Sequence, residues 1–371
     1  MTIFFVLGVV LILALIIFLF IQLSPEFGGK ASHDQKDAYA LTTHFKQGKF
    51  ENELPTPMNL SFSQYVSLLK KYIVGVPNNA PENKLPVQKL DSTAVVDHPD
   101  SLTTITWFGH SAFLLQMQGQ TILLDPMFGD VPAPHPWLGN KRFSNGLPIE
   151  IDRLPKIDAV IFSHDHYDHL DYGSVVKLKD KVQKFYVPLG LAAHLTEWGV
   201  PTESIHELNW WDEIEHEGIT LACTPARHFS GRGLTDRFST FWCSWAIIGS
   251  SKKIYFSGDS GYGPHFKAIG EKYGPFDFAM MECGQYNELW HNIHMMPEET
   301  AQASVDVQAK LMMPIHWGSF VLALHTWSDP VERLSKKATE LNQPFVIPQI
   351  GLPLVLEHEE LPDSRWWRQI K

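Results

Sequence analysis

The hydrophobic pattern opens with a run from Ile3 to Leu23 that is apolar except for the late Gln22 and carries no charge. A helix of about 20 apolar residues is long enough to cross a hydrocarbon core about 30 Å thick. A signal peptide is the alternative, but no basic side chain precedes the run and no Ala-x-Ala cleavage site precedes Pro25. The pattern therefore predicts an uncleaved membrane-spanning segment over 1–24.

The next region, 25–100, is polar and rich in proline, and the stretch from Ser61 to Tyr72 within it has helical periodicity. Ser61 or Ser63 would cap this helix, and five apolar side chains fall on one of its faces: Phe62, Tyr65, Leu68, Leu69 and Tyr72. A helix that lies on a membrane surface usually carries more Lys and Arg on its polar face. We therefore expect this accessory helix to pack against the rest of the protein.

From Thr103 onward the pattern becomes that of a sheet, with short apolar strands between glycine-containing turns. An antiparallel start is expected from strands over 104–108, 112–115 and 121–124. Later segments alternate, with strands expected over 159–162, 185–187, 219–223, 242–248, 253–257, 278–281 and 311–315, and helices over 191–198, 264–273, 297–307 and 329–341. This pattern predicts an α+β domain over 101–358, followed by a tail over 359–371.

The charge balance changes the set of expected partners. The formal net charge is −11 and the sequence pI is about 5.9. Without a basic stripe, nucleic acid is not an expected partner.

The charges next to the apolar run indicate its orientation. Four lysines follow the run and no side-chain cation precedes it, which favours a cytoplasmic catalytic domain: Lys30, Lys36, Lys46 and Lys49. The three cysteines lie in or beside apolar runs, without Cys-x-x-Cys spacing, and are expected in the core.

Candidate chemistry is concentrated in residues 163–170, Ser-His-Asp-His-Tyr-Asp-His-Leu, directly after an apolar strand. Residues two apart in an extended chain point the same way, so His164 and His166 can hold one cation. Asp168 and His169 follow in what we expect to be the first turn of a helix, directed at a second cation. These ligands suit zinc, with iron or manganese as alternatives. The competing interpretations are a polar loop with chance histidines and a structural metal site.

The spacing His-x-His-x-Asp-His resembles the motif of the metallo-β-lactamase superfamily. Three isolated residues follow in the order that this superfamily uses: His228, Asp259 and His316. The resemblance implies two Zn²⁺ ions, one held by His164, His166 and His228, the other by Asp168, His169 and His316, with Asp259 bridging them. It also implies an αββα sandwich.

Longer stretches resemble the N-acylphosphatidylethanolamine phospholipase D group of that superfamily, over about 101–353. They are 107–111, 124–128, 228–237, 294–299 and 315–320. This resemblance implies a phosphodiesterase that acts on a phospholipid, with water activated by the two metals. The N-terminal apolar run has no place in this set of motifs, so membrane attachment is expected from its hydrophobicity alone. It further implies that His294 acts as a general acid that is not a metal ligand, and that Asp168 or Asp259 orients the water.

Two other functions fit the same ligands: a lactonase or other small-molecule hydrolase, and a metal-binding protein without turnover. Arg232 and Arg237 either receive a lipid phosphate or are surface charges. His294 has a structural alternative as a cap of the helix that begins at Pro297.

Two further residues and one loop are expected to have supporting roles. His110 is expected to hydrogen-bond to backbone rather than bind metal. Asp125 is expected to orient a ligand imidazole. The proline-rich stretch 128–148 either overhangs the metals and accepts an apolar part of the substrate, or covers the surface.

Overall fold

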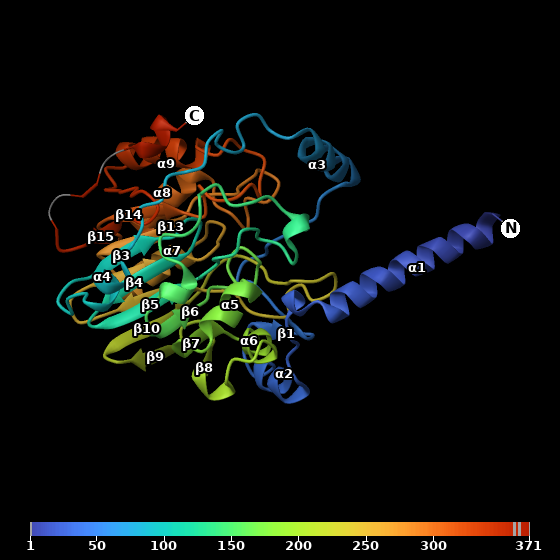
Figure 1. Cartoon of the computed structure of the whole chain (residues 1–371), viewed down its shortest axis with the longest axis horizontal. Helices are drawn as coiled ribbons and strands as arrows, with labels where there is room; N and C mark the ends of the chain where they lie inside the picture. The colour runs from blue at the N-terminus through green and yellow to red at the C-terminus, as the bar shows by residue number, and fades with distance from the viewer. Residues whose placement is uncertain (1, 359–360, 363–364, 371) are drawn as a thin grey trace.

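Two β-sheets lie face to face, with helices on their outer sides, in the computed structural model of residues 2–358, 361–362 and 365–370 (Figure 1). Residue 1 of the predicted anchor lies outside the described residues, as do residues 359–360, 363–364 and 371 of the predicted tail. The αββα sandwich expected from the sequence is confirmed.

The first sheet has the strand order β15-β3-β4-β5-β6-β7-β8. Its strands are β3 (Thr104–Trp107), β4 (Phe113–Met117), β5 (Gln120–Leu124), β6 (Ile157–Ile161), β7 (Val182–Pro188), β8 (Ile205–Leu208) and β15 (Pro353–Val355). β3, β4 and β5 pair antiparallel, as predicted, whereas β5 to β8 pair parallel. Side chains alternate between the two faces, so Ile122 and Leu124 belong to the core between the sheets and Leu123 to the core beneath the outer helices.

The second sheet has the strand order β14-β13-β12-β11-β10-β9. Its strands are β9 (Glu213–His216), β10 (Ile219–Thr224), β11 (Ser244–Ile248), β12 (Lys253–Phe256), β13 (Phe278–Glu282) and β14 (Met312–Ile315). β12, β13 and β14 run parallel, and β10 runs in their direction because β11 is antiparallel to both β10 and β12. Their carboxyl ends therefore meet at one edge of the sheet.

Helices cover both outer faces. The first sheet carries α5 (Tyr172–Leu178) and α6 (Ala192–Glu197), and the second carries α7 (His265–Tyr273), α8 (Pro297–Asp306) and α9 (Asp329–Glu340). The helices predicted over 191–198, 264–273, 297–307 and 329–341 begin and end within one residue of their expected bounds, whereas α5 begins later than the helix expected to start at Asp168. The shorter elements are α2 (His33–Tyr39), β1 (Phe45–Lys46), β2 (Lys49–Phe50), α4 (Ser92–Val96) and the 3₁₀ turns η1 (Pro25–Phe27), η2 (Pro136–Leu138), η3 (Ile151–Arg153), η4 (Thr202–Ser204) and η5 (Trp366–Gln369).

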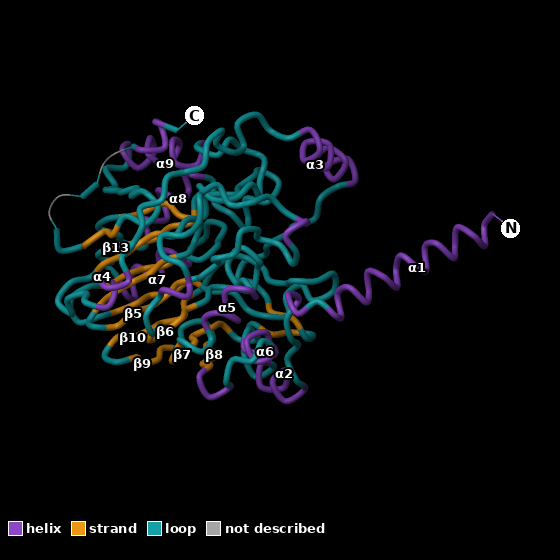
Figure 2. Tube along the Cα trace, in the orientation of Figure 1, coloured by secondary structure: helices purple, strands orange, loops and turns teal. Residues whose placement is uncertain are grey.

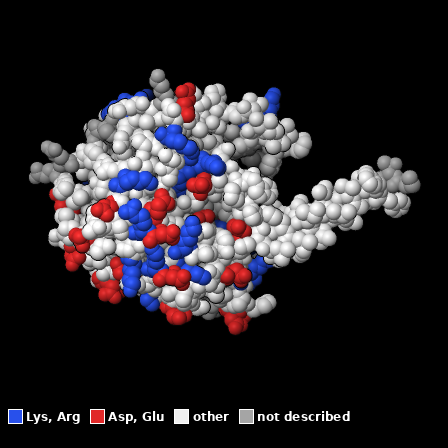
Figure 3. Space-filling view, viewed as in Figure 1, with Lys and Arg blue, Asp and Glu red and all other residues white. Residues whose placement is uncertain are grey.

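The N-terminal helix α1 (Thr2–Leu23) projects away from the body (Figure 1). Its segment Phe4–Leu23 is long and apolar enough to cross a membrane. Contact with the body is made at its C-terminal end, where the Phe20 ring lies 5.7 Å from Phe27 and 6.0 Å from Trp137. In Figure 3 the body carries intermixed basic and acidic side chains, whereas the projecting helix carries neither.

Regions 25–100 and 359–371 both contribute to the core. Tyr39, Phe50 and Leu85 of the first region are buried among side chains that lie between the two sheets. Trp366 and Trp367 of the predicted C-terminal tail are buried, with the Trp366 ring stacked 5.9 Å from that of Trp317. The boundary at residue 100 stays a prediction.

The accessory helix is α3 (Phe62–Val74), capped by Ser61, whose side chain accepts a hydrogen bond from the backbone N–H of Gln64. The expectation that it packs against the body is wrong for most of its surface. Leu68 is its one buried residue, and the apolar side chains around it are exposed. The sequence pattern located the apolar face of this helix but contained no information about what covers it.

Candidate metal centre

The sequence motif 163–170 lies at the carboxyl end of β6, where the loops of both sheets gather (Figure 2). The backbone N–H groups of His169 and Leu170 both donate to His166 O, at 3.0 and 2.8 Å, and this closes a tight turn. The expectation that Asp168 and His169 begin a helix is therefore wrong. Helix α5 begins later because the Asp171 carboxylate accepts from Ser174 N and caps it there.

The other predicted ligands approach this turn from neighbouring strand ends. His228 follows β10, Asp259 follows β12 and His316 follows β14. Asp259 is brought close by Gly258, which has φ of +54° and lies where a Cβ atom would be 2.7 Å from the Cβ of Ser163. Only glycine fits a position that combines this conformation with so little space.

The structure brings all seven predicted ligands together in two adjoining groups. In each group one ligand atom per residue lies within 4.8 Å of the others: His164, His166, His228 and Asp259 in one, and His110, Asp168, His169 and His316 in the other. These are the two ligand sets expected from the sequence, with Asp259 in the first and His110 added to the second. Asp259 also faces the second set, since its Oδ2 lies 3.1 Å from His169 Nε2.

The donor atoms at the centre fit metal ions. His169 Nε2 and Asp259 Oδ1 are buried and make no hydrogen bond. His166 Nδ1 lies 3.0 Å from His164 Nε2 and 3.2 Å from His228 Nε2, so three ring nitrogens converge on one point. A cation bound between converging imidazole nitrogens and carboxylate oxygens would be the partner that these buried atoms lack.

The electrostatics favour the neutral form of three of these imidazoles, but not of His169. Burial lowers the pKa of His164, His228 and His316 well below the usual value, and nearby imidazoles lower it further. Burial acts on His169 in the same direction, but the charges of Asp259 and Asp168 outweigh it and raise the pKa of His169. Neutral imidazole is the form that binds a metal ion.

Asp125 holds one of these imidazoles in place, as expected from the sequence. Its Oδ2 lies 2.6 Å from His169 Nδ1, and its Oδ1 accepts a hydrogen bond from Ser163 N at 2.7 Å. With Nδ1 occupied in this way, Nε2 of His169 is directed toward the metal centre.

The expectation for His110 is wrong. This side chain contacts the Asp168 carboxylate, with 2.8 Å between His110 Nε2 and Asp168 Oδ2, and its ring lies 4.2 Å from that of His316. Its Nδ1 is buried without a hydrogen bond, so the ring has no backbone partner. His110 therefore faces the second ligand group from the end of β3. Its position after a strand was the signal in the sequence.

His294 lies beside the metal centre and is not a helix cap. Its Nδ1 lies 3.1 Å from Glu282 Oε1, and its ring stacks on that of His316 at 5.3 Å. Glu282 is fully buried at the end of β13 and also accepts a hydrogen bond from Met295 N. The cap position of α8 is Met296. Glu282 was not identified from the sequence, where its one signal was an acidic residue that ends an apolar strand.

Arg232 is neither a phosphate ligand nor a surface charge. Its side chain is buried and donates to the backbone carbonyls of Asp165 and Leu170, which flank the turn of residues 166–169 with its candidate ligands. It also donates to Glu26 O, directly after α1. Arg232 therefore connects the segment that follows the N-terminal helix to the loop that carries the candidate ligands.

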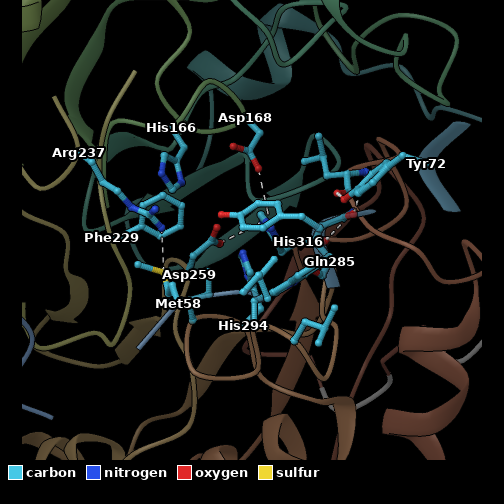
Figure 4. A pocket seen from close by; sticks show the side chains of 16 residues that line it. Met58, Tyr72, His166, Asp168, Phe229, Arg237, Asp259, Gln285, His294 and His316 are labelled. Carbon is cyan, nitrogen blue, oxygen red and sulfur yellow. Dashed lines mark hydrogen bonds and ion pairs between the residues drawn. The ribbon is translucent and has the colours of Figure 1, made fainter. Parts of the chain in front are cut away.

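A cavity of about 360 Å³ opens above the two ligand groups (Figure 4). His166, Asp168, Asp259, His294 and His316 line its base. The walls are largely apolar and come from α3, its preceding segment and the loops after β10, β13 and β14: Met58, Leu60, Tyr65, Tyr72, Phe229, Leu289, Trp290, Ile293 and Leu322. No residue of 128–148 lines the cavity among the described residues, and Phe128, Phe143 and Leu147 of this stretch are buried in the cores.

Arg237 is the one lysine or arginine among the described residues that line this cavity. Its guanidinium lies 4.5 Å above the Phe229 ring and donates to Met58 Sδ, without a carboxylate partner among its described hydrogen bonds and ion pairs. Burial lowers the pKa of Arg237 from its usual value, although arginine keeps its charge near neutral pH.

Comparison with known proteins adds the family. The sequence model of one protein family, the β-lactamase superfamily domain, matches residues 120–317. An uncharacterized protein of Mycobacterium tuberculosis is 44% identical over 255 residues, which cover 68% of each chain. The N-acyl-phosphatidylethanolamine-hydrolyzing phospholipase D 1 of Caenorhabditis elegans is 35% identical over 251 residues, 64% of this chain and 70% of that one.

Among solved structures, a metallo hydrolase from Ignicoccus hospitalis superimposes with a TM-score of 0.52 and 22% identity, covering 70% of this chain and 100% of that one. This likeness shows the fold. Taken with the family match over the region that carries the ligands, it shows that the chain belongs to the metallo-β-lactamase superfamily and is a metal-dependent hydrolase.

Proposed function

We propose that this protein is a zinc-dependent phosphodiesterase of the phospholipase D type, acting on N-acylphosphatidylethanolamine-like phospholipids. The observation that carries the proposal is the cavity, which combines a double metal-ligand set at its base with apolar walls and a single arginine. The similarity to a relative named as an N-acyl-phosphatidylethanolamine-hydrolysing phospholipase D supports the same substrate class.

The two ligand groups would hold two Zn²⁺ ions, with His164, His166 and His228 on one and Asp168, His169 and His316 on the other. Asp259 faces both groups and would bridge them. When bound, such ions activate water for attack and neutralise charge on phosphate oxygens. Asp168 and Asp259 line the base of the cavity, where their carboxylates would also orient the attacking water.

His294 would donate the proton that the leaving alcohol requires. Burial alone lowers its pKa, but the hydrogen bond to Glu282 and the charges of Glu282 and Asp259 raise the pKa of His294 above its usual value. An imidazole whose Nδ1 is held by a buried carboxylate presents its Nε2 to the cavity in a fixed direction. Glu282 is then a positioning residue for His294.

Arg237 would receive the phosphate of the lipid. The lipid phosphate is anionic, and a guanidinium at the wall of a largely apolar cavity binds phosphate oxygens with directed hydrogen bonds. The apolar side chains around it would contact the acyl groups of the substrate.

Localisation follows from α1. We propose that 1–24 is an uncleaved, single-pass membrane anchor, because Phe4–Leu23 is apolar, exposed and directed away from the body. The lysines after the helix favour a cytoplasmic catalytic domain, and the proposed boundaries remain 25–100 for the accessory segment and 101–358 for that domain.

The chemical class of the reaction is tested with a substrate panel. We expect the metal-loaded protein to hydrolyse bis-p-nitrophenyl phosphate and to leave simple lactones intact, because Arg237 and the two ligand groups suit a phosphodiester anion. Rates are measured at equal protein and metal content. Lactone hydrolysis without phosphodiester hydrolysis would favour a lactonase, and bound metal without either reaction would favour a metal-binding protein.

A further inference from the structure

The outer face of α3 is apolar and uncovered. Phe62, Val66, Leu69 and Ile73 follow one another at helical spacing and therefore form a single stripe. Their exposed fractions are 84%, 51%, 62% and 77%. No other part of the described structure covers this stripe.

A different side of the same helix faces the cavity. Tyr65 and Tyr72 line the cavity wall, and Leu68 between them is the buried residue of the helix. The hydroxyl of Tyr72 donates to Leu322 O and fixes the helix across the opening. One side of α3 therefore forms a wall of the cavity, and the adjacent side is an exposed apolar surface.

Two further exposed apolar residues lie near α1. Trp137 and Leu138 of η2 have exposed fractions of 71% and 47%, and the Trp137 ring lies 6.0 Å from Phe20 of α1. Figure 1 shows α1 and α3 on the same side of the body. We define the apolar rim as Phe62, Val66, Leu69, Ile73, Trp137 and Leu138.

We propose that the apolar rim rests in the boundary between headgroups and acyl chains of the bilayer that α1 crosses, so that the cavity opens onto the membrane surface. A phospholipid would then reach the metal centre along α3 while its acyl chains stay in the bilayer. This inference rests on the proposed function and on the proposed anchor.

A bilayer fits the rim for three reasons. α1 would keep the body next to the membrane at all times, on the side where the rim lies. The rim contains Trp137, a residue type enriched at the membrane interface. Next to the stripe, α3 carries Ser63, Ser67, Lys70 and Lys71, so the helix has an apolar and a polar side, as an interfacial helix requires, although two lysines are fewer basic residues than such helices usually carry.

The test labels single cysteines in the full chain, reconstituted in vesicles of phosphatidylethanolamine and phosphatidylglycerol. The native cysteines are free and buried, so an engineered surface cysteine is the one that reacts. Nitroxide labels are attached at Leu69→Cys and Ile73→Cys in the rim, at Ser67→Cys on the polar face of α3, at Glu271→Cys on α7, and at Leu13→Cys on α1. Collision with oxygen, which concentrates in lipid, is compared with collision with a water-soluble nickel chelate.

We expect the labels at 13, 69 and 73 to collide at least about threefold more with oxygen, relative to the nickel chelate, than those at 67 and 271, as lipid insertion requires. Rim labels as accessible to the chelate as the label at 271 would overturn the inference. So would rim labels shielded from both reagents and close enough to broaden one another, because a second copy of the chain would then cover the rim. A water-accessible label at 13 would also overturn it.

A second arm measures turnover. Leu69→Ser combined with Ile73→Ser should lower hydrolysis of lipid in vesicles about tenfold and leave hydrolysis of bis-p-nitrophenyl phosphate unchanged, since neither residue lines the cavity. Ser67→Ala is the matched control on the same helix. Unchanged lipid hydrolysis in the double variant would count against the rim. Insertion of the rim labels without any lipid hydrolysis by the parent protein would instead refute the proposed function.

Discussion

Replacement of His169 by alanine should reduce the metal content from two ions per chain toward one and lower hydrolysis on the order of a thousandfold, because one ligand group loses its central imidazole. His169 is fully buried, its Nδ1 is held by Asp125, and its Nε2 has no hydrogen bond. Metal content is measured by elemental analysis after gel filtration, and rates are measured with bis-p-nitrophenyl phosphate.

His206→Ala is the matched control, because His206 is partly exposed, stacks on Tyr186 and belongs to neither ligand group. It should keep both ions and full activity. Two ions retained in His169→Ala, or a parent protein that holds only one ion, would contradict the assignment of two ligand sets.

His294→Ala should retain both metal ions but hydrolyse a lipid substrate about a hundredfold more slowly, as expected when a general acid is removed. The reason is its position, since His294 faces the cavity next to His316 while its other nitrogen is bound to Glu282. The loss should shrink for bis-p-nitrophenyl phosphate, because p-nitrophenolate departs without a proton. His316→Ala should instead impair both substrates alike, since it removes a candidate ligand.

His291→Ala provides the control for this prediction, because His291 is an exposed histidine in the same loop. It should have no effect on either substrate. Equal losses on the lipid and on the p-nitrophenyl ester in His294→Ala, with intact metal content, would remove the acid role and leave His294 as a residue that positions the substrate.

The sequence predicted the parts of the structure that depend on local spacing. Alternation of apolar residues located the strands, and the interval between His164 and His166 predicted that both imidazoles would face one point. The superfamily resemblance then identified His228, Asp259 and His316, which the structure places beside the motif. Strand order explains the agreement, because β6, β10, β12 and β14 each end at most a few residues before one of these ligand segments.

Contacts between distant segments could not be predicted in the same way. Arg232 was a charged residue in a loop, and only the fold shows that it binds Glu26 O and two carbonyls that flank the turn of residues 166–169. Glu282 is a single acidic residue at a strand end, and its role depends on the approach of His294. The amphipathic pattern of α3 gave its apolar face but not whether protein, solvent or membrane would cover it.

The most direct test of the account is product analysis of a lipid digest. Purified, metal-loaded protein is incubated with N-acylphosphatidylethanolamine in vesicles, and the products are identified by mass spectrometry. The account predicts equal amounts of phosphatidic acid and N-acylethanolamine, formed by cleavage between the phosphate and the headgroup and absent with His169→Ala. Fatty acid with lysophospholipid, or intact lipid in the presence of two bound metal ions, would contradict it.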